Sequence, residues 1–433
     1  MKSERMRFIR VSFFVCVLGL LIACHDSRKE HTDGRCAEKS SEQSICITSD
    51  YKETPNLISL SWIADTVFYL RLEHKMTRDV YKVDYTEDLV FLYDLDSIFA
   101  FEHTGALKYR IPASGCSVDI LQDKQKIYVY SFRNNAIFEY DFCGQKVRTI
   151  RLKHSAIDGY GSNFLTINDT LFAIAKLNEG RNKYELLFFN SSGNVVGHKN
   201  NPHPFSPQST ACVFRSPWER TLFRTPEGCR YYRAYGDTLF AIGPNMEITP
   251  VWVEEKLSKV PLESSLEYRG GKLAAFLDSC RKNHWYSVRY MESKRFVIAE
   301  YVPGRSPNDL PGYMIYDKKD KTLSRLEQSL ASGFASHKLH FGIMNDYDGG
   351  LGFTPLCQSG DYLIMVNAGF SQGGLKNAPK TLYEKGRIIN GEKCICRSDS
   401  CVNVNAQKKL KDFIGRFDEE QNTMLSIVKL KEP

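Results

Sequence analysis

Short apolar segments, each preceded by a polar turn, recur along most of the chain. Residues 168–174 (Asn-Asp-Thr-Leu-Phe-Ala-Ile) return almost unchanged at 236–242 (Gly-Asp-Thr-Leu-Phe-Ala-Ile), with six identities in register. A turn pair followed by alternating or wholly apolar residues is typical of the start of a β-strand. Weaker copies begin near Leu89, Ile127, Phe296 and Tyr362. The sequence therefore predicts six similar strand starts.

In several copies a second apolar segment follows and ends in a polar loop with glycine at a fixed offset. The segments 98–105, 137–144 and 186–193 all end in this way, and residues 314–317 form a degenerate version. Glycine supplies the positive φ that a tight hairpin requires. Each unit is thus predicted to contain at least two antiparallel strands joined by a short loop.

Repeats of this size, each a small sheet that cannot bury both faces alone, are typical of a β-propeller. Six starts over residues 57–433 give about 63 residues per blade, which leaves room for insertions. The first and last sheets of a ring must meet to avoid bare edges, so we expect strands at 57–60 and 67–70 to share one blade with a strand at 424–430. Two short helices are predicted, at 272–282 and 406–417. The predicted fold class is an all-β, six-bladed propeller.

Composition narrows the class of protein without changing this prediction. Hydrophobic residues make up 42% of the chain and charged residues 25%, which excludes collagen-like, disordered and polytopic membrane proteins. The formal net charge of +7 falls to about +4 once residues 1–23 are set aside, because Lys2, Arg5, Arg7 and Arg10 outnumber Glu4 there. Nucleic-acid partners are not expected, since they require a clustered basic face.

The N-terminus resembles a bacterial lipoprotein signal. Basic residues precede an apolar stretch from Val11 to Ala23 that is too short to span a bilayer as a helix, and Leu21-Ile22-Ala23-Cys24 resembles the lipobox. We expect residues 1–23 to be cleaved as a signal peptide and Cys24 to be acylated. Residues 24–56 are polar and without periodicity, as in a flexible tether, and residues 57–433 would form the propeller.

The chain resembles the six-bladed, TolB-like propeller lipoproteins of the Bacteroidetes envelope. The lipobox, the hairpins that end in glycine, the aromatic segment 284–296 after the first predicted helix, and residues 345–355 (Asn-Asp-Tyr-Asp-Gly-Gly-Leu-Gly-Phe-Thr-Pro) carry this resemblance. It covers nearly all of the chain after Cys24 and implies the fold, but most of that group has no assigned reaction. It also implies a location in the cell envelope. The outer membrane is the favoured membrane, and the protein could lie on its periplasmic face or on the cell surface.

Cysteines and carboxylates raise the question of metal sites. Eleven cysteines remain after Cys24, and Cys394, Cys396 and Cys401 could hold a local disulfide or a metal, although structural zinc usually has paired ligand elements. Asp346 and Asp348 are candidate calcium ligands, but they also suit a structural turn that locks the fifth blade to the sixth. We expect no cofactor, with calcium as the alternative.

One pattern could indicate catalysis. Ser371 lies in a Gly-x-Ser-x-Gly sequence, but glycine and proline follow where a helix is needed, and the last histidine, His340, precedes it. No catalytic residue is therefore predicted.

His337 and His340 could ligate a metal together with Asp346 and Asp348. On a strand, however, their spacing places the two histidines on opposite faces.

Four segments match the Asp-Ser/Thr-aliphatic acceptor pattern for O-glycans in exported proteins of that phylum. The same pattern also suits entry into a hairpin, and the two interpretations are compatible. The candidate residues are Thr66, Ser97, Thr170 and Thr238.

The sequence thus predicts a monomeric, lipid-anchored envelope propeller that acts as a non-catalytic binding module. Loops from all blades surround one opening, where a peptide, a glycan or a protein partner could bind. The alternatives are a hydrolase or lyase that acts on glycan or peptide at the central channel, and a structural part of an envelope complex. Two channel carboxylates with a histidine would favour the enzyme, and a large exposed apolar patch would favour the structural role.

Overall fold

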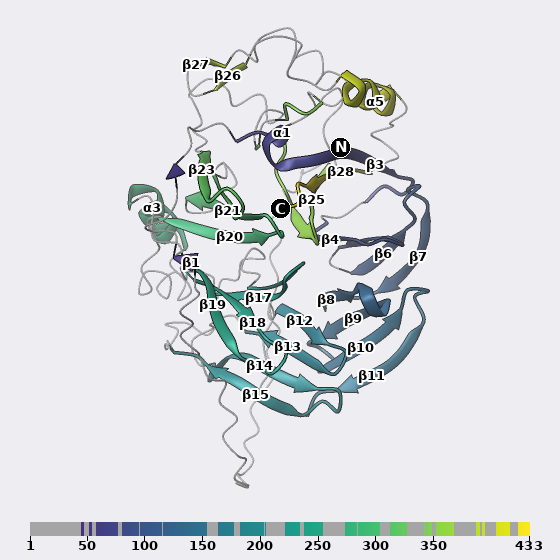
Figure 1. Ribbon diagram of the computed structural model, residues 1–433. Helices are drawn as coiled ribbons and strands as arrows, with labels where there is room; N and C mark the ends of the chain where they lie inside the picture. Colours follow the sequence, from purple (N-terminus) through teal and green to yellow (C-terminus); the bar gives the residue numbers. More distant parts are fainter. Residues whose placement is uncertain are drawn as a thin grey trace, which may run out of the picture.

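Six small antiparallel sheets surround a common axis in the computed structural model (Figure 1). We name them blades I to VI in chain order and call the contact between neighbouring blades a seam. The structure describes residues 45–46, 52–53, 58–76, 80–94, 96–114, 116–153, 163–176, 182–202, 204, 221–233, 238–253, 273–283, 285–303, 312–326, 342–343, 345–348, 352–367, 387–389, 392–394, 404–415 and 423–433. The predicted all-β, six-bladed propeller is confirmed.

Blades I to III follow one another along the chain, each with four strands in sequence order. Blade I contains β4 (Lys82–Tyr85), β5 (Val90–Tyr93), β6 (Ser97–Phe101) and β7 (Leu107–Pro112). Blade II contains β8 (Cys116–Leu121), the short helix η1 (Gln122–Lys124), β9 (Lys126–Ser131), β10 (Ala136–Asp141) and β11 (Lys146–Arg151). Blade III contains β12 (Asn163–Asn168), β13 (Leu171–Ala175), β14 (Tyr184–Asn190) and β15 (Val195–Asn200).

Blades IV and V have the same order and an added edge strand each. Blade IV contains β16 (Leu222–Thr225), β17 (Gly228–Tyr232), β18 (Thr238–Ile242) and β19 (Ile248–Val253), and β1 (Ile45–Cys46) pairs in parallel with β19. Blade V contains β20 (Tyr286–Glu292), β21 (Phe296–Pro303), β22 (Gly312–Asp317) and β23 (Thr322–Leu326), and β2 (Lys52–Glu53) pairs in parallel with β23. Both added strands fall in the range 24–56, where the sequence predicted only a tether.

Blade VI joins the two ends of the chain, as predicted. Its strand order is β24 (Cys357–Ser359), β25 (Tyr362–Asn367), β28 (Thr423–Leu430) and β3 (Ala64–Leu72). The C-terminal strand β28 therefore lies between β25 and the N-terminal strand β3, which leaves no gap in the ring (Figure 1). A two-stranded sheet, β26 (Arg387–Ile389) with β27 (Glu392–Cys394), is inserted between β25 and β28.

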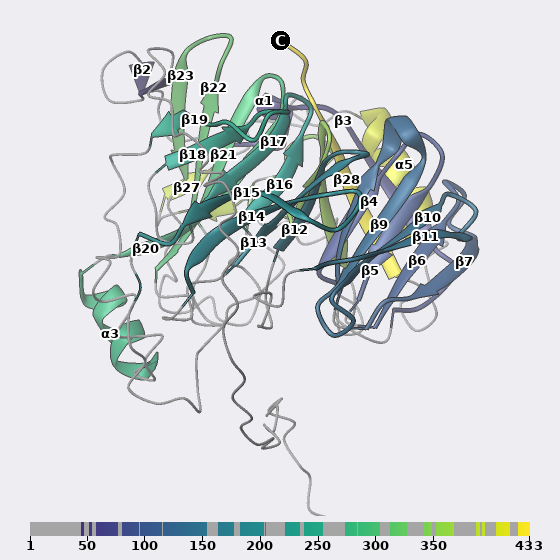
Figure 2. The same cartoon turned by 90° about the horizontal axis from the view of Figure 1, so that it is seen from below.

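The two predicted helices are confirmed at nearly the expected bounds, as α3 (Leu273–Asn283) and α5 (Val404–Gly415). Helix α5 lies beside β3, whereas α3 lies outside the ring near β20, as the views in Figures 1 and 2 agree. The strand expected at residues 57–60 is wrong, because Leu60 begins a short helix, α1 (Leu60–Ile63), and only Ser59 forms an isolated bridge. Leu60 and Ile63 are both buried, so the apolar residues that suggested a strand serve a helical turn instead.

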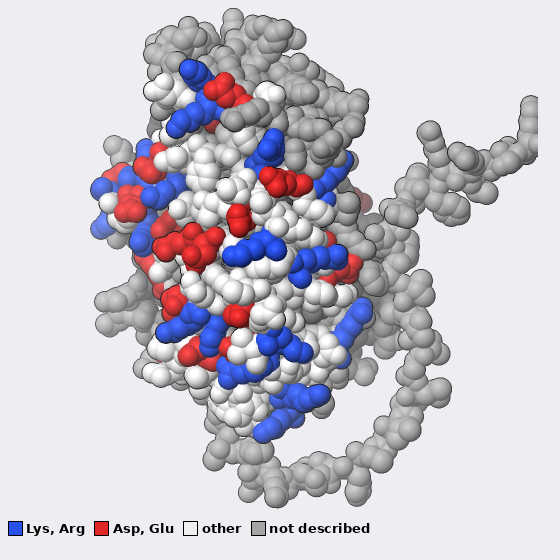
Figure 3. Space-filling view, turned by 90° about the vertical axis from the view of Figure 1, so that its right-hand side faces the viewer, with Lys and Arg blue, Asp and Glu red and all other residues white. Residues whose placement is uncertain are grey.

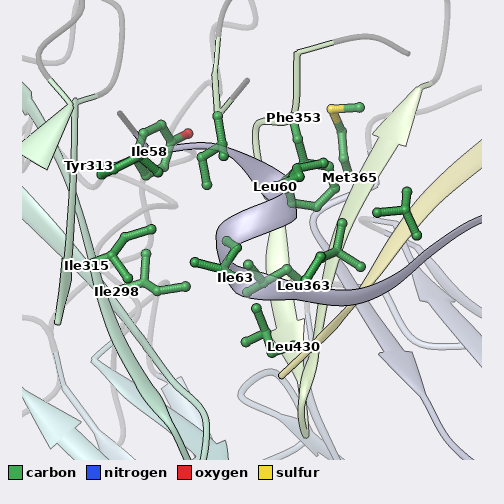
Figure 4. Packing of buried hydrophobic residues seen from close by; sticks show 14 of the residues in the cluster. Ile58, Leu60, Ile63, Ile298, Tyr313, Ile315, Phe353, Leu363, Met365 and Leu430 are labelled. Atoms are coloured by element: carbon green, nitrogen blue, oxygen red, sulfur yellow. The ribbon is translucent and has the colours of Figure 1, made fainter. Parts of the chain in front are cut away.

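The hydrophobic core is divided among the seams. Six clusters of buried side chains occur in the described residues, and each draws on two neighbouring blades. The cluster at the V–VI seam includes α1, whose Leu60 and Ile63 pack with Ile298, Ile315 and Leu363 (Figure 4). Each sheet thus buries its two faces against its neighbours rather than against a central core.

The predicted hairpin glycines lie in the left-handed region, at φ +95° for Gly105, +79° for Gly144 and +77° for Gly193. All three also approach the preceding blade closely. A Cβ atom on Gly105 would lie 1.8 Å from the Arg71 carbonyl oxygen, one on Gly193 would lie 2.0 Å from that of Arg151, and one on Gly144 would lie 2.8 Å from the Tyr109 ring. The glycines are therefore needed for close approach between blades as well as for the turn.

The two nearly identical segments, 168–174 and 236–242, do not occupy equivalent positions in their blades. Both copies start strands as predicted, but residues 171–174 belong to the second strand of blade III, β13, whereas residues 238–242 form the third strand of blade IV, β18. The second strand of blade IV is β17, which the pattern missed because it begins with Gly228 and contains Arg230.

One face of the ring carries the short turns between the first and second strands and between the third and fourth strands. We call it the hairpin face. Residues 86–89 join β4 to β5 there, and residues 102–106 join β6 to β7.

Candidate functional site

The axis of the ring is hollow. A cavity of about 1200 Å³ is lined by the first strands of all six blades, β4, β8, β12, β16, β20 and β24, together with η1. We call this cavity the axial channel. A pocket in which side chains from sequence-distant segments converge is the usual place for a ligand in a protein of this shape.

Two ion pairs lie in the interior of the channel. Lys82 Nζ lies 2.9 Å from Asp84 Oδ2 within blade I, and Arg224 Nη2 of blade IV lies 2.8 Å from Asp119 Oδ2 of blade II. Burial opposes the charged form of Arg224, but its charged neighbours, with the Asp119 carboxylate first, outweigh burial and raise the pKa of the guanidinium. The carboxylates of Asp84 and Asp119 are therefore each paired with a cation.

Side chains of the wall also bond to the main chain of the next blade. The Cys357 Sγ atom accepts from the Val83 N–H at 3.2 Å and lies 3.4 Å from the Val83 carbonyl oxygen. Ser359 Oγ accepts from the Tyr85 N–H at 2.9 Å and donates to the Tyr85 carbonyl at 3.2 Å. These bonds satisfy the open edge of β4, which would otherwise expose unpaired polar groups.

The II–III seam uses the same device. Ser117 Oγ accepts from the Phe164 N–H at 3.2 Å, and Asp119 Oδ2 accepts from the Thr166 N–H at 2.8 Å. Asp119 therefore has a double role, in the ion pair with Arg224 and in the bond to β12. The wall is held in place before any ligand arrives.

The mouth of the channel on the hairpin face is more acidic than its interior. Exposed Glu87, Asp88 and Asp123 line it, with Lys124 as a nearby cation. Gln125 Nε2 donates to Asp88 Oδ2 at 3.1 Å across the I–II seam. The mouth is therefore a polar rim built from hairpin loops.

Asp346 and Asp348, the predicted calcium candidates, lie away from the channel and hold the N-terminal segment. Asp346 Oδ1 accepts from the Ser61 N–H at 2.8 Å in the first turn of α1, and its Oδ2 accepts from the Ser61 hydroxyl. The N-cap residue of α1, Ser59, makes no side-chain capping bond, so Asp346 takes over that role.

Asp348 is buried and accepts a hydrogen bond from the Tyr69 hydroxyl on β3 at 2.9 Å. Burial, with the Asp348 carboxylate next in importance, raises the pKa of Tyr69 well above its ordinary value. Within the described part of the chain, no group of three His, Cys, Asp or Glu side chains is arranged to hold a metal ion. The aspartates act here as a lock between residues 345–348 and the start of the ring.

The four O-glycan candidates differ in accessibility. Thr66 on β3 and Thr170 in the β12–β13 turn are exposed, and Thr238 at the start of β18 is half-buried. Ser97 is only 1% exposed, and its hydroxyl accepts a bond from Arg110 Nε at 2.7 Å. Modification of any of them stays a prediction, with Thr66 and Thr170 as the open sites.

Several candidates fall outside the described residues. They are Cys24, His337, His340, Ser371, Cys396 and Cys401, together with the expected signal peptide at 1–23. Their predicted roles therefore stay predictions.

Sequence patterns missed the residues of the channel wall. Two of the first strands, β4 (Lys-Val-Asp-Tyr) and β24 (Cys-Gln-Ser), are short and polar, so they lack the apolar alternation that marks the other strands. One signal was present in every blade except blade IV: the first strand precedes a recognised strand start by a short polar turn.

Six antiparallel sheets around an axial channel define the class as a six-bladed β-propeller. Within that class, the chain belongs to the family described as "Domain of unknown function (DUF4934)", which it matches over residues 42–429. The match begins before β1, so it includes the two edge strands that cover blades IV and V.

Several solved structures resemble this chain at low sequence identity. A Bacteroides fragilis protein described as exported aligns with a TM-score of 0.58 and 15% identity, over 88% of this chain and 99% of that one. A DUF4221 member from Bacteroides vulgatus has a TM-score of 0.38 and 11% identity, over 63% and 88% of the two chains. Virginiamycin B lyase from Staphylococcus aureus has a TM-score of 0.36 and 10% identity, over 61% and 75%. The likeness to the Bacteroides fragilis protein shows the fold alone.

No curated protein matches the sequence. Within the described residues, no helix is both long and apolar enough to cross a membrane.

Proposed function

We propose that the protein is an exported, lipid-anchored binding module of the bacterial envelope, and that its axial channel receives the ligand. The observation that carries the proposal is the channel itself, a cavity of about 1200 Å³ on which the first strands of all six blades converge. Fold alone does not identify a ligand, so the argument depends on the wall of this cavity.

The state of the wall favours recognition over catalysis. A general acid or base must exchange a proton with the substrate, whereas Asp84 and Asp119 are each engaged by a neighbouring cation. Asp119 also accepts from the Thr166 N–H, which ties it to the next blade. Such a wall presents fixed donors and acceptors to a ligand, and we expect the hydrolase or lyase alternative to fail for this reason.

A structural role in a larger complex has less support. Among the described residues, the large apolar side chains that are exposed are Leu107, Val147 and Val196, one on each outer strand of blades I to III. Positive and negative side chains are interspersed over the face seen in Figure 3, and basic ones predominate in its lower half. An extended apolar contact surface is therefore not part of the proposal.

The location in the envelope is supported by the sequence. The basic and apolar segment before Cys24 resembles a lipoprotein signal, and membership of the TolB-like group would imply the same location. If Cys24 carries the lipid, Cys24→Ala moves the protein from the membrane fraction to the soluble fraction. A variant that stays in the membrane fraction contradicts the anchor.

The binding proposal is tested by blocking the mouth. Gln122 on η1 is exposed and lines the channel, so Gln122→Trp places an indole at its entrance. Lys108→Trp adds the same bulk on the exposed outer strand β7 and is the matched control. The natively produced protein and both variants are purified, and bound molecules are identified by native mass spectrometry.

We expect one small-molecule or peptide species with the unaltered protein and with Lys108→Trp, and its loss with Gln122→Trp. The same species on all three proteins, or none on any of them, overturns the channel as the binding site. Turnover of the species by the unaltered protein would favour the enzyme.

A further inference from the structure

A row of aromatic side chains lies at the VI–I seam on the hairpin face. It consists of Phe68 on β3, Tyr362 at the start of β25, Tyr85 at the end of β4 and His103 in the β6–β7 loop, and we call it the aromatic row. The ring centroids of Tyr85 and Tyr362 are 4.7 Å apart, and those of Tyr85 and His103 are 4.9 Å apart. Phe68 contacts both tyrosines, at 5.7 and 6.4 Å.

The aromatic row differs from the aromatic pairs of other seams in its exposure. Tyr128 and Phe172 at the II–III seam are fully buried, and Tyr232 and Tyr290 at the IV–V seam are nearly so. In the aromatic row the tyrosines and Phe68 are half-buried and His103 is exposed. Within the described chain, the Tyr85 and Tyr362 hydroxyls bond to no protein group and are not enclosed.

The aromatic row adjoins the mouth of the channel. Thr86 and Glu87, which directly follow Tyr85, line the channel, and so do Gly360 and Asp361, which precede Tyr362. His103 is held over this edge by a hydrogen bond of 3.0 Å between its Nε2 atom and the Glu87 carbonyl oxygen. A ligand that lies on the aromatic row can therefore continue into the channel.

The chemistry of the aromatic row fits a sugar ring. A pyranose has a flat face of C–H groups that packs on an aromatic face and an equator of hydroxyls that needs donors and acceptors. The tyrosine hydroxyls, the imidazole of His103 and the carboxylate of Glu87 supply such partners around the apolar rings. The exposed carboxylates of Glu87 and Glu102 disfavour an anionic sugar at this place.

We propose that the aromatic row is a carbohydrate-binding subsite for an uncharged oligosaccharide at the rim of the axial channel. The proposal deepens the proposed function by naming a ligand class, and it rests on that function only for the continuation of the ligand into the channel. Tyr362 and Tyr85 pack against the sugar face, and His103 and Glu87 bond to its hydroxyls.

The test measures binding of defined probes to the full chain. Maltotriose, cellotriose and chitotriose are the neutral probes and trigalacturonate is the acidic one, with saturation-transfer NMR for detection and titration for affinity. Tyr362→Leu keeps apolar volume in the seam but removes the aromatic face, and His103→Ala changes only an exposed loop residue. His198→Ala is the matched control, because His198 on β15 packs on Tyr184 with ring centroids 4.6 Å apart, in a different blade.

We expect at least one neutral trisaccharide to bind and trigalacturonate to bind less well. Tyr362→Leu and His103→Ala should each weaken binding about twofold to tenfold, the range for one aromatic contact, and His198→Ala should leave it unchanged. Melting curves verify that each variant is folded, and His103→Ala keeps the test valid if Tyr362→Leu is not. The absence of binding by every neutral probe, or equal binding by all variants, overturns the proposal.

The two proposals fail in different ways. If Gln122→Trp loses the native ligand while the aromatic row variants keep it, the channel is the site and the subsite is wrong. If the aromatic row variants lose the trisaccharide while Gln122→Trp keeps both molecules, the subsite stands and the channel proposal is wrong.

Discussion

Two seams of the ring are held together by different kinds of interaction, neutral hydrogen bonds in one and ion pairs in the other. At the VI–I seam, Cys357 and Ser359 bond as neutral groups to the main chain of β4. At the IV–V seam, Arg230 Nε donates to Glu292 Oε2 at 2.6 Å, and Lys318 Nζ lies 2.7 Å from Glu292 Oε1. Glu292 is 4% exposed and Arg230 is 5% exposed, so this network of charges is desolvated.

This difference shows that the strand arrangement is repeated from blade to blade, whereas the side chains that hold neighbouring blades together are not. We call the bonds of Cys357 and Ser359 to β4 the neutral latch, and the network of Arg230, Glu292 and Lys318 the ionic latch. When one partner is removed, the neutral latch loses only its own hydrogen bonds. Removing one partner of the ionic latch leaves a buried charge without its full compensation, which costs much more free energy. The IV–V seam should therefore be the more vulnerable of the two to mutation, and of the two only the IV–V seam should lose stability in acid.

The largest effect is expected from Glu292→Ala. The substitution leaves Arg230 and Lys318 with only the exposed Glu227 as an anionic partner, so the free energy of unfolding should fall by about 3 kcal/mol, the lower end of the range for a broken buried pair. Urea denaturation measures it, with Glu432→Ala near the exposed C-terminus as the control. A loss no greater than that of the control would show that the ionic latch does not stabilise the ring.

A smaller but still large effect is expected from Gly105→Ala at the VI–I seam. Left-handed backbone strain costs about 1–2 kcal/mol for a residue with a Cβ atom, and the clash with the Arg71 carbonyl adds to it. Gly360→Ala is the control, because Gly360 has φ +56° but open space around its Cβ position. Melting temperatures that fall equally for both would show that close approach between blades is unimportant.

Ser359→Ala should cost about 1 kcal/mol, because the Tyr85 N–H and carbonyl lose one partner each but lie beside the water-accessible channel. Ser192→Ala in an exposed hairpin loop is the control and should be neutral. Denaturant midpoints compare the two variants. A loss as large as that of Glu292→Ala would erase the distinction between neutral and ionic latches.

The smallest effect concerns pH. Burial alone would raise the pKa of Glu292, but the hydrogen bond and charge of Arg230 and the charge of Lys318 outweigh it and lower this pKa. The stabilising contribution is therefore present above the unfolded-state value of about 4.3 and is lost as the pH falls through the lower folded value. The difference in unfolding free energy between the unaltered protein and Glu292→Gln should narrow between pH 6 and pH 3, and parallel curves would contradict the assignment.

Patterns in the sequence predict the strands that bury apolar residues, and the structure confirms the hairpin glycines Gly105, Gly144 and Gly193 at positive φ. In blades IV and V the corresponding left-handed position is occupied by Met246 and Lys321, so the glycine signal is lost there although the turn is kept. Sequence spacing therefore reveals the fold class more reliably than it reveals which strands are equivalent.

The residues of the axial channel were harder to predict from the sequence than the fold. Channel residues such as Asp84, Asp119 and Arg224 come from three blades, and only the closed ring brings them together. Asp346 lies in a turn, but its hydrogen-bond partner Ser61 is 285 residues away. Local patterns contain no information about such partners, because the contacts depend on how the ring closes.

The pairing of β3 with β28 has a consequence for biosynthesis. Strand β3 has no hydrogen-bonding partner on β28 until residues 423–430 have been synthesised. A chain that stalls before β28 therefore keeps two unpaired strand edges in blade VI, and such edges favour aggregation and proteolysis.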